Sequence, residues 1–377
     1  MLLFLTLCIT LFFIMKNYSI HLISTLLLLS LWSCGSKESA YHPQTGSLFV
    51  FADDSCYAIR YDDNPIFAIK ANTASLYYND RALFQNEDGM WGYIDSKGAT
   101  ALSSLYDRAT VFSEGLAWVI TGDDMPGAIN EKGDVKISLR GTERVRVFHE
   151  GRAAFLIKKK NKYLWGFIDK NGHEVVKPQY KNVKDFRLGL APVQDDETAL
   201  CGYINLNHET VIGCQYNEAY PFNDEGKAIV KSDDRYFVIN RQGDVLTKHN
   251  YTQMRPDHSW AMIQQDNLWG WCNEKGEIAI TPAFEACRPF GANGLAPVKI
   301  RGKWGYINRE GKAVIKRQFT EAYPFLDGCA AVKTGTVWGF INDKGTFTVN
   351  PQYDFISQDY LYQVLGDGCA YSTLNIE

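Results

Sequence analysis

The sequence predicts an all-β protein, built from a tandem array of about nine antiparallel meanders of roughly 35 residues each. Two observations support this prediction. A phrase returns along the chain, consisting of Trp-Gly, an aromatic residue, Ile, then Asp or Asn, and strand-forming residues gather in short runs between turn residues. The period of the phrase fits a supersecondary repeat. Clear copies begin at Trp91-Gly92, Trp165-Gly166, Trp269-Gly270, Trp304-Gly305 and Trp338-Gly339.

Weaker copies of the phrase fill the gaps between the clear ones. In these copies Pro126, Cys201 and Tyr236 take the position of the Trp, and the earliest copy starts at Cys56. Terminal units that depart from the consensus are typical of the caps of a repeat array. We therefore expect one repeat β domain over residues 46–377.

Each repeat contains three runs of strand-forming residues. The runs read Gly-Leu-Ala-Pro-Val, Trp-Gly-aromatic-Ile-Asp and Val-Val, and turn residues such as Asp343-Lys344-Gly345 separate them. Asp or Asn can bond the backbone two residues on, and Gly supplies positive φ, so these turns join antiparallel neighbours. One unit is thus expected to be a three-stranded meander.

Stacking of neighbouring units must bury the repeated Trp, because a lone meander is too small to do so. We therefore interpret the Trp residues as core residues, with a carbohydrate-stacking platform as the alternative. A Gly inside a strand marks the close approach of another backbone or ring. The repeated Trp-Gly pairs are accordingly expected to have structural roles.

These repeats resemble the WG-repeat (KWG-repeat) family of bacterial proteins. The pattern of Trp-Gly-aromatic-Ile-Asp, Pro-x-Tyr-Asp and Phe-x-x-Gly-Leu-Ala recurs over residues 91–119, 165–193, 269–298 and 304–332. Departures lie at 126, 201, 236 and the amino end, where they put regular stacking in doubt. The resemblance implies a repeat scaffold with no shared catalytic residues.

The array can close in two ways, as a propeller-like ring or as an open solenoid or superhelix. Nine units exceed the usual four to eight blades of a propeller, which favours an open array. Three short antiparallel strands per unit are typical of blades, and on this ground we favour the propeller-like arrangement.

The amino terminus resembles a bacterial lipoprotein signal peptide. Lys16 precedes an apolar run that ends in Leu-Trp-Ser-Cys, and this pattern implies cleavage before Cys34 and acylation of its thiol and new amino group. Residues 1–14 add an apolar run without a basic start, which suggests that translation begins at Met15. An uncleaved membrane anchor is the alternative.

The predicted organisation is therefore a signal peptide over residues 1–33, a polar tether over residues 34–45 after the lipidated Cys34, and the repeat domain. It places the protein in the bacterial cell envelope, attached to the membrane through Cys34, with the outer membrane favoured. The periplasmic or surface face stays open.

The charge of the chain argues against nucleic acid as a partner. Without residues 1–33 the chain holds 38 basic and 43 acidic residues, a net charge of −5. The longest basic run is Lys158-Lys159-Lys160, so no extended basic surface is expected.

The cysteines and the motif search give few chemical candidates. Cys201 and Cys214 flank a turn at nearly equal distances, so a cross-strand disulfide is one interpretation and buried free thiols are the other. Metal-ligand spacings, nucleophile elbows and phosphate loops are absent from the sequence. We therefore expect no metal, no cofactor and no enzymatic activity.

The function that these observations favour is a non-catalytic binding or scaffolding module for another envelope protein. A glycan-binding module is the alternative. It would depend on aromatic residues outside the Trp register, namely Tyr77, Tyr78, Trp260, Tyr360 and Tyr362.

Overall fold

The computed structural model describes residues 48–52, 55–60, 65–121, 125–247, 251–365 and 370–376. Residues Pro43–Glu377 form one compact unit. The predicted signal peptide and the whole tether, with Cys34, lie outside the described residues and stay predictions.

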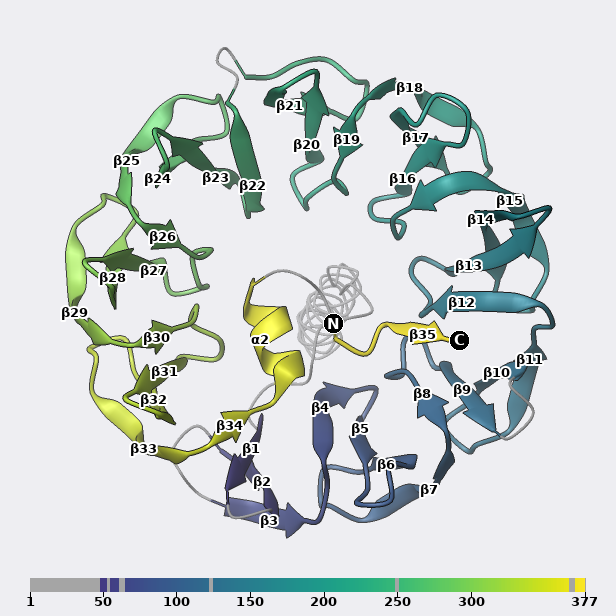
Figure 1. Ribbon diagram of the computed structural model, residues 1–377, viewed down its shortest axis with the longest axis horizontal. Coiled ribbons are helices and arrows are strands. Elements are labelled where there is room, and N and C mark those ends of the chain that lie inside the picture. Colours follow the sequence, from purple (N-terminus) through teal and green to yellow (C-terminus); the bar gives the residue numbers. More distant parts are fainter. Residues whose placement is uncertain are drawn as a thin grey trace, which may run out of the picture. The chain divides into compact units, whose positions relative to one another are not determined.

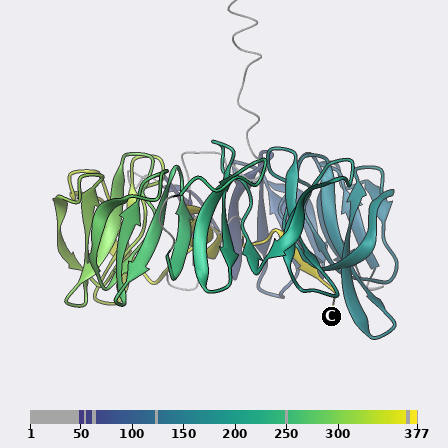
Figure 2. The ribbon, with the colours of Figure 1, turned by 90° about the horizontal axis from the view of Figure 1, so that it is seen from above.

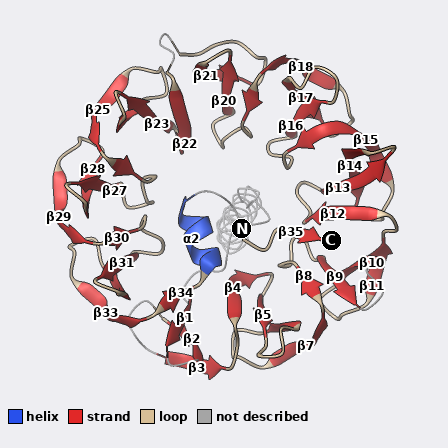
Figure 3. Ribbon diagram, viewed as in Figure 1, coloured by secondary structure: helices blue, strands red, loops and turns tan. Residues whose placement is uncertain are grey.

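The repeat domain is a ring of antiparallel sheets, which confirms the predicted all-β, propeller-like fold (Figure 1). The described residues form eight sheets, and one of them is eight-stranded. That sheet holds two blades, because β15 is the outer strand of one blade and the inner strand of the next. The described residues therefore form nine blades. Strands dominate the domain, and α2 is the one helix in its described part (Figure 3).

The blades follow one another in chain order, and the strands cross the thickness of the ring (Figure 2). The first three blades contain β1 (Leu48–Ala52), β2 (Ser55–Ile59) and β3 (Pro65–Ile69); β4 (Thr73–Tyr78), β5 (Arg81–Gln85), β6 (Trp91–Ile94) and β7 (Thr100–Tyr106); and β8 (Arg108–Ala109), β9 (Ala117–Thr121), β10 (Met125–Ile129) and β11 (Val135–Ser138). Blades four to six contain β12 (Thr142–Arg146), β13 (Arg152–Lys159), β14 (Lys162–Asp169) and β15 (Glu174–Val183); β16 (Leu190–Asp195), β17 (Cys201–Asn205) and β18 (Thr210–Tyr216); and β19 (Glu218–Ala219), β20 (Lys227–Ser232) and β21 (Arg235–Asn240). Blades seven to nine contain β22 (Gln253–Asp257), β23 (Trp260–Gln265), β24 (Leu268–Cys272) and β25 (Ile278–Phe284); β26 (Ala286–Cys287), β27 (Leu295–Ile300), β28 (Lys303–Asn308) and β29 (Ala313–Phe319); and β30 (Glu321–Ala322), β31 (Ala330–Thr334), β32 (Val337–Ile341) and β33 (Phe347–Tyr353).

Blade eight shows how the repeat forms a blade. Its second, third and fourth strands, β27, β28 and β29, are the three predicted runs in the predicted order. The sequence analysis missed the inner strand β26, which has two residues and pairs with β27. Eight of the nine blades are therefore a three-stranded meander plus an inner strand that follows the outer strand of the preceding blade, and the sixth has the inner strand β19 with β20 and β21.

The two ends of the repeat domain meet in the first blade. The inner strand there is β34 (Phe355–Ile356), which follows the ninth blade and pairs with β1 through Val50 and Ile356. The first blade therefore has an inner strand from the end of the chain, and this pairing closes the ring. An open array would leave β1 unpaired on this side.

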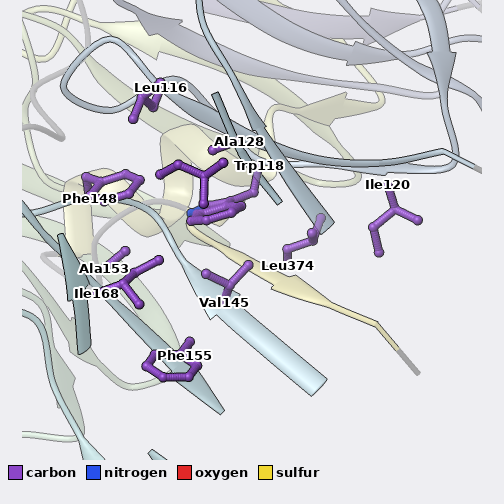
Figure 4. Packing of buried hydrophobic residues seen from close by; sticks show 11 residues of the cluster. Leu116, Trp118, Ile120, Ala128, Val145, Phe148, Ala153, Phe155, Ile168 and Leu374 are labelled. Carbon is purple, nitrogen blue, oxygen red and sulfur yellow. The ribbon is translucent and has the colours of Figure 1, made fainter. Parts of the chain in front are cut away.

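The chain continues inside the ring beyond β34, as helix α2 (Gln358–Leu365) and strand β35 (Thr373–Asn375) (Figure 1). Strand β35 pairs with β12 of the fourth blade, where Leu374 lies opposite Val145. Leu374 joins the buried cluster around Trp118, between the third and fourth blades (Figure 4). The C-terminal segment thus links the closing blade to the fourth blade.

The most deeply buried repeat position is the aromatic residue two places after the Trp. Its members are at most 1% exposed: Tyr93, Phe167, Tyr203, Trp271, Tyr306 and Phe340. The predicted burial of the repeated Trp holds for Trp165, Trp304 and Trp338, whereas Trp91 and Trp269 are half-buried. The Trp therefore lies at the margin of the core.

The Gly at the second position of the WG phrase lets the outer strand approach closely in six blades, as predicted, at Gly92, Gly166, Gly202, Gly270, Gly305 and Gly339. A Cβ on Gly202 would lie 2.5 Å from the backbone oxygen of Ile212, whereas a Cβ on Gly213, on the facing strand, would meet no atom within 4 Å.

We expect Gly202→Ala to lower the free energy of unfolding by about 1–3 kcal/mol through overpacking. Gly213→Ala is the control, with little loss or a small gain expected. Urea unfolding of both variants tests this, and equal losses would contradict the close-approach account.

Candidate functional site

A cavity of about 440 Å³ opens where the first blade, completed by β34, adjoins the second. Its volume lies in the range of ligand-binding clefts. The ring-closing segment contributes Asp354, Phe355, Ile356 and Gln358, and the first two blades contribute Phe51, Ala52, Ser55, Ala71, Asn72, Thr73 and Glu87. We call this the closure groove.

Phe355 is the most exposed large apolar side chain that lines the closure groove. It is 69% exposed, more than any other large apolar side chain among the described residues. The same position of the inner strand holds Arg108 in the third blade and Glu218 and Glu321 in the sixth and ninth. Asn182 in the fifth blade and Ala286 in the eighth take the same position. An exposed aromatic ring thus lies where these five blades carry charged, amide or small side chains.

Two carboxylates give the closure groove its charge. Asp354 precedes Phe355, and its side chain is exposed. Glu87 lies 3.7 Å from the ammonium of Lys70, but both side chains are well exposed and such a pair contributes about 0–1 kcal/mol. Histidine, cysteine, lysine and arginine are absent from the described lining of the groove. An apolar ring beside acidic groups suits a ligand with apolar and cationic parts.

Hydrogen bonds hold one wall of the closure groove. Asn72 donates from its amide nitrogen to the backbone oxygen of Asn86, at 2.8 Å. The hydroxyl groups of Thr73 and Tyr371 lie 2.6 Å apart, and the Tyr371 ring packs 5.5 Å from that of Trp91. The C-terminal segment therefore braces the second blade at the groove.

A sequence profile described as "WG containing repeat" matches the chain seven times, over residues 91–123, 165–198, 202–236, 236–269, 269–304, 304–335 and 338–359. The matches cover more than half of the chain. The protein belongs to the WG-repeat family. In the WG repeats matched here, a segment such as 304–335 starts in the third strand of one blade and ends in the second strand of the next. One sequence repeat therefore does not coincide with one blade, because it supplies strands to two neighbouring blades. This offset allows β34, from the end of the chain, to complete the first blade.

One of the similar solved structures supports the fold of this chain, and only its fold. A crystal structure entitled "the eukaryotic initiation factor" aligns with a TM-score of 0.58 at 11% identity, covering 84% of this chain and 98% of that one. BamB from Moraxella catarrhalis aligns with a TM-score of 0.40 at 10% identity, covering 84% and 93%. A search of curated proteins returned no significant match. Over the described residues, no helix is both long and apolar enough to cross a membrane.

The WG positions are distributed around the ring and do not form a shared site. Three of their Trp rings, those of Trp165, Trp269 and Trp304, instead pack against an arginine from the inner part of the same blade. The Arg146 guanidinium lies 4.8 Å from the ring centre of Trp165, and that of Arg288 lies 4.4 Å from the ring centre of Trp304. Such contacts stabilise a fold and bind no ligand by themselves.

The disulfide considered as one interpretation for Cys201 and Cys214 is not formed, and both cysteines are half-buried free thiols. The reason is the strand register. A bulge around Gly202 places Cys201 opposite Tyr216, so Cys214 is not its direct cross-strand partner. The alternative interpretation, of free thiols, describes these residues.

The aromatic residues proposed for glycan binding do not form one surface. Tyr77, Tyr78 and Tyr360 are at most 3% exposed. Tyr362 is exposed on α2, whereas Trp260 is half-buried and packs 5.9 Å from the Phe290 ring. Burial of three of the five removes most of the support for a carbohydrate platform there.

Sequence reasoning missed the closure groove, although a signal for it exists. Phe355 directly follows Tyr353-Asp354, at the place where other repeats read Tyr106-Asp107-Arg108 or Phe319-Thr320-Glu321. Comparison of this position among the repeats would have identified Phe355 as the aromatic exception.

Proposed function

We propose that this WG-repeat protein is a non-catalytic lipoprotein of the bacterial envelope, which binds another envelope protein in the closure groove. The observation that carries the proposal is Phe355, an exposed ring in the closure groove. At the same position, five other blades carry the charged, amide or small side chains of Arg108, Asn182, Glu218, Ala286 and Glu321. Exposed aromatic residues in a cleft are frequent anchors of protein interfaces. The repeat ring supplies a rigid frame for such a site.

The partner's contact segment should carry an apolar side chain for Phe355 and a basic side chain for Asp354 or Glu87. This follows from the acidic and apolar lining of the closure groove. Charge pairing at an exposed rim mainly speeds association, whereas burial of the ring supplies most of the affinity.

Phe355→Ser should abolish partner recovery, because it removes the apolar anchor without opening the core. Leu105→Ser is a matched control, since Leu105 is 67% exposed on the outer strand β7. The measurement is in-cell crosslinking of the tagged protein in its native bacterium, with affinity isolation and identification of bound proteins and sugars. We expect at least a tenfold loss of one specific protein with Phe355→Ser and no loss with Leu105→Ser.

Two other outcomes of this affinity isolation would contradict the proposal. A protein retained equally by both variants would place binding elsewhere on the ring. Saccharide without a protein partner would favour the glycan alternative.

The lipid anchor is tested separately, at Cys34. Mass spectrometry of the wild type should show a protein that begins at Cys34 and carries acyl chains, whereas Cys34→Ala should carry none, because the cysteine is the acylated residue of the signal. Cys8→Ala is the control, since Cys8 precedes the proposed start at Met15 and should have no effect. A wild-type protein that keeps residues 16–33 and carries no acyl chain would instead support the uncleaved anchor.

A further inference from the structure

The fifth blade lacks the indole that other repeats place between blades. Cys201 takes the first position of the WG phrase and faces Tyr216 of the outer strand. The pairing is the one that Trp165 makes with Tyr180 and Trp304 with Phe319. The backbone of this blade is thus that of a Trp-containing blade, with a much smaller side chain.

A cation remains beside this position. Arg146 precedes Phe148 by two residues and stacks over Trp165, and Arg288 precedes Phe290 by two residues and stacks over Trp304. Lys184 precedes Phe186 by the same spacing. Its own blade offers no indole, and its ammonium lies 4.2 Å from the ring centre of Tyr220 in the next blade.

Lys184 has no ion-pair partner within the described residues. The nearby Glu218 is engaged elsewhere, since it lies 3.3 Å from the Lys231 ammonium and accepts a hydrogen bond of 2.8 Å from the Tyr236 hydroxyl. Burial lowers the pKa of Lys184. Within the described residues, the close partner of the half-buried Lys184 ammonium is thus the face of the Tyr220 ring.

The missing indole leaves space. A cavity of about 160 Å³ lies between the fifth and sixth blades, lined by Lys184, Gln194, Cys201, Asn217, Glu218 and Tyr220 among others. A cavity of about 150 Å³ in a protein core can hold a benzene molecule. Among the described residues, the donor to the Asn217 backbone oxygen is the Cys201 thiol, at 3.7 Å, and an indole N–H is a stronger donor.

We propose that this cavity binds the indole ring of a ligand, which takes the place of the absent tryptophan. The ring stacks against the Lys184 ammonium, as the indoles of Trp165 and Trp304 stack against their arginines. Its N–H donates to the Asn217 carbonyl oxygen. The indole comes either from a small molecule or from a tryptophan of a partner polypeptide. Phe355 does not line this cavity, so the indole proposal can fail or succeed independently of the proposed role of the closure groove.

The test is titration of the lipid-free domain, residues 43–377, with indole and with N-acetyl-tryptophanamide, followed by heteronuclear NMR and calorimetry. Saturable binding of one ligand per chain is expected. Cys201→Trp fills the cavity and should weaken binding at least tenfold, with a raised melting temperature. Lys184→Met keeps the side-chain length without the charge and should weaken binding roughly threefold to tenfold.

Cys214→Ser is the matched control, because Cys214 lies on the adjacent strand but does not line the cavity. It should bind as the wild type does. Binding of both ligands supports a polypeptide source, and binding of free indole alone supports a small molecule. Absence of saturable binding, or unchanged binding by folded Cys201→Trp, overturns the proposal. If Cys201→Trp does not fold, the Lys184→Met variant decides: an unchanged affinity of this variant for indole would overturn the proposal.

Discussion

Trp271→Ala should destabilise the ring more than loss of any repeated WG tryptophan. The indole of Trp271 is fully buried and packs 5.1 Å from the Phe290 ring. Its Nε1 donates to the buried Asp257 carboxylate at 2.6 Å, so truncation also leaves that carboxylate short of a donor. Removal of a buried Trp costs about 3–5 kcal/mol, and we expect a loss in the free energy of unfolding at or above the top of that range. Urea unfolding followed by circular dichroism measures it.

The control is Trp269→Ala, two residues earlier on β24. Trp269 is half-buried and stacks against Arg255 at 5.1 Å. Its truncation should cost about 1–2 kcal/mol, from a partly exposed ring and one cation–π contact. An equal or larger loss for Trp269→Ala would show that the WG tryptophan, and not the following aromatic residue, is the main core residue.

Asp359→Ala should release the C-terminal segment from the ring. The Asp359 side chain is fully buried and accepts hydrogen bonds from the Leu76 amide at 2.9 Å and the Tyr78 hydroxyl at 3.0 Å, both in the second blade. It also accepts one from the Ala370 amide at 2.9 Å. Each buried donor left without a partner costs about 1–3 kcal/mol, so we expect a total loss of about 3–5 kcal/mol. Denaturant unfolding measures this loss, and hydrogen exchange should show faster exchange in α2 and β35.

Gln358→Ala is the control for that variant, since Gln358 directly precedes Asp359 and is exposed. It should change stability by at most about 0.5 kcal/mol. Unchanged protection of residues 358–376 in Asp359→Ala would contradict the view that this carboxylate fixes the segment.

The strands were predictable because their signals are local. The run Leu295-Ala296-Pro297-Val298 and the phrase from Trp304 predict β27 and β28, and the turn residues between them predict antiparallel pairing. The inner strands were missed because a two-residue strand such as β30 has no periodicity. Ring closure depends on the pairing of β34 with β1, a contact between chain ends that no local pattern specifies.

The candidate site was less predictable, because it depends on departures from the repeat. The repeated Trp and Gly residues maintain the blades, and their regularity says little about a ligand. Phe355 and Cys201 are exceptions to two different repeat positions. Their meaning depends on the cavities beside them, which only the packing of neighbouring blades defines.

The most direct test of the proposed docking role is site-specific photocrosslinking from within the closure groove. A photoreactive phenylalanine derivative would replace Phe355 in one strain and Leu105 in another, and both would be irradiated in living cells. We expect one discrete protein adduct from position 355 and none from position 105. The same adducts from both positions, or no protein adduct from position 355, would contradict the docking role of the groove.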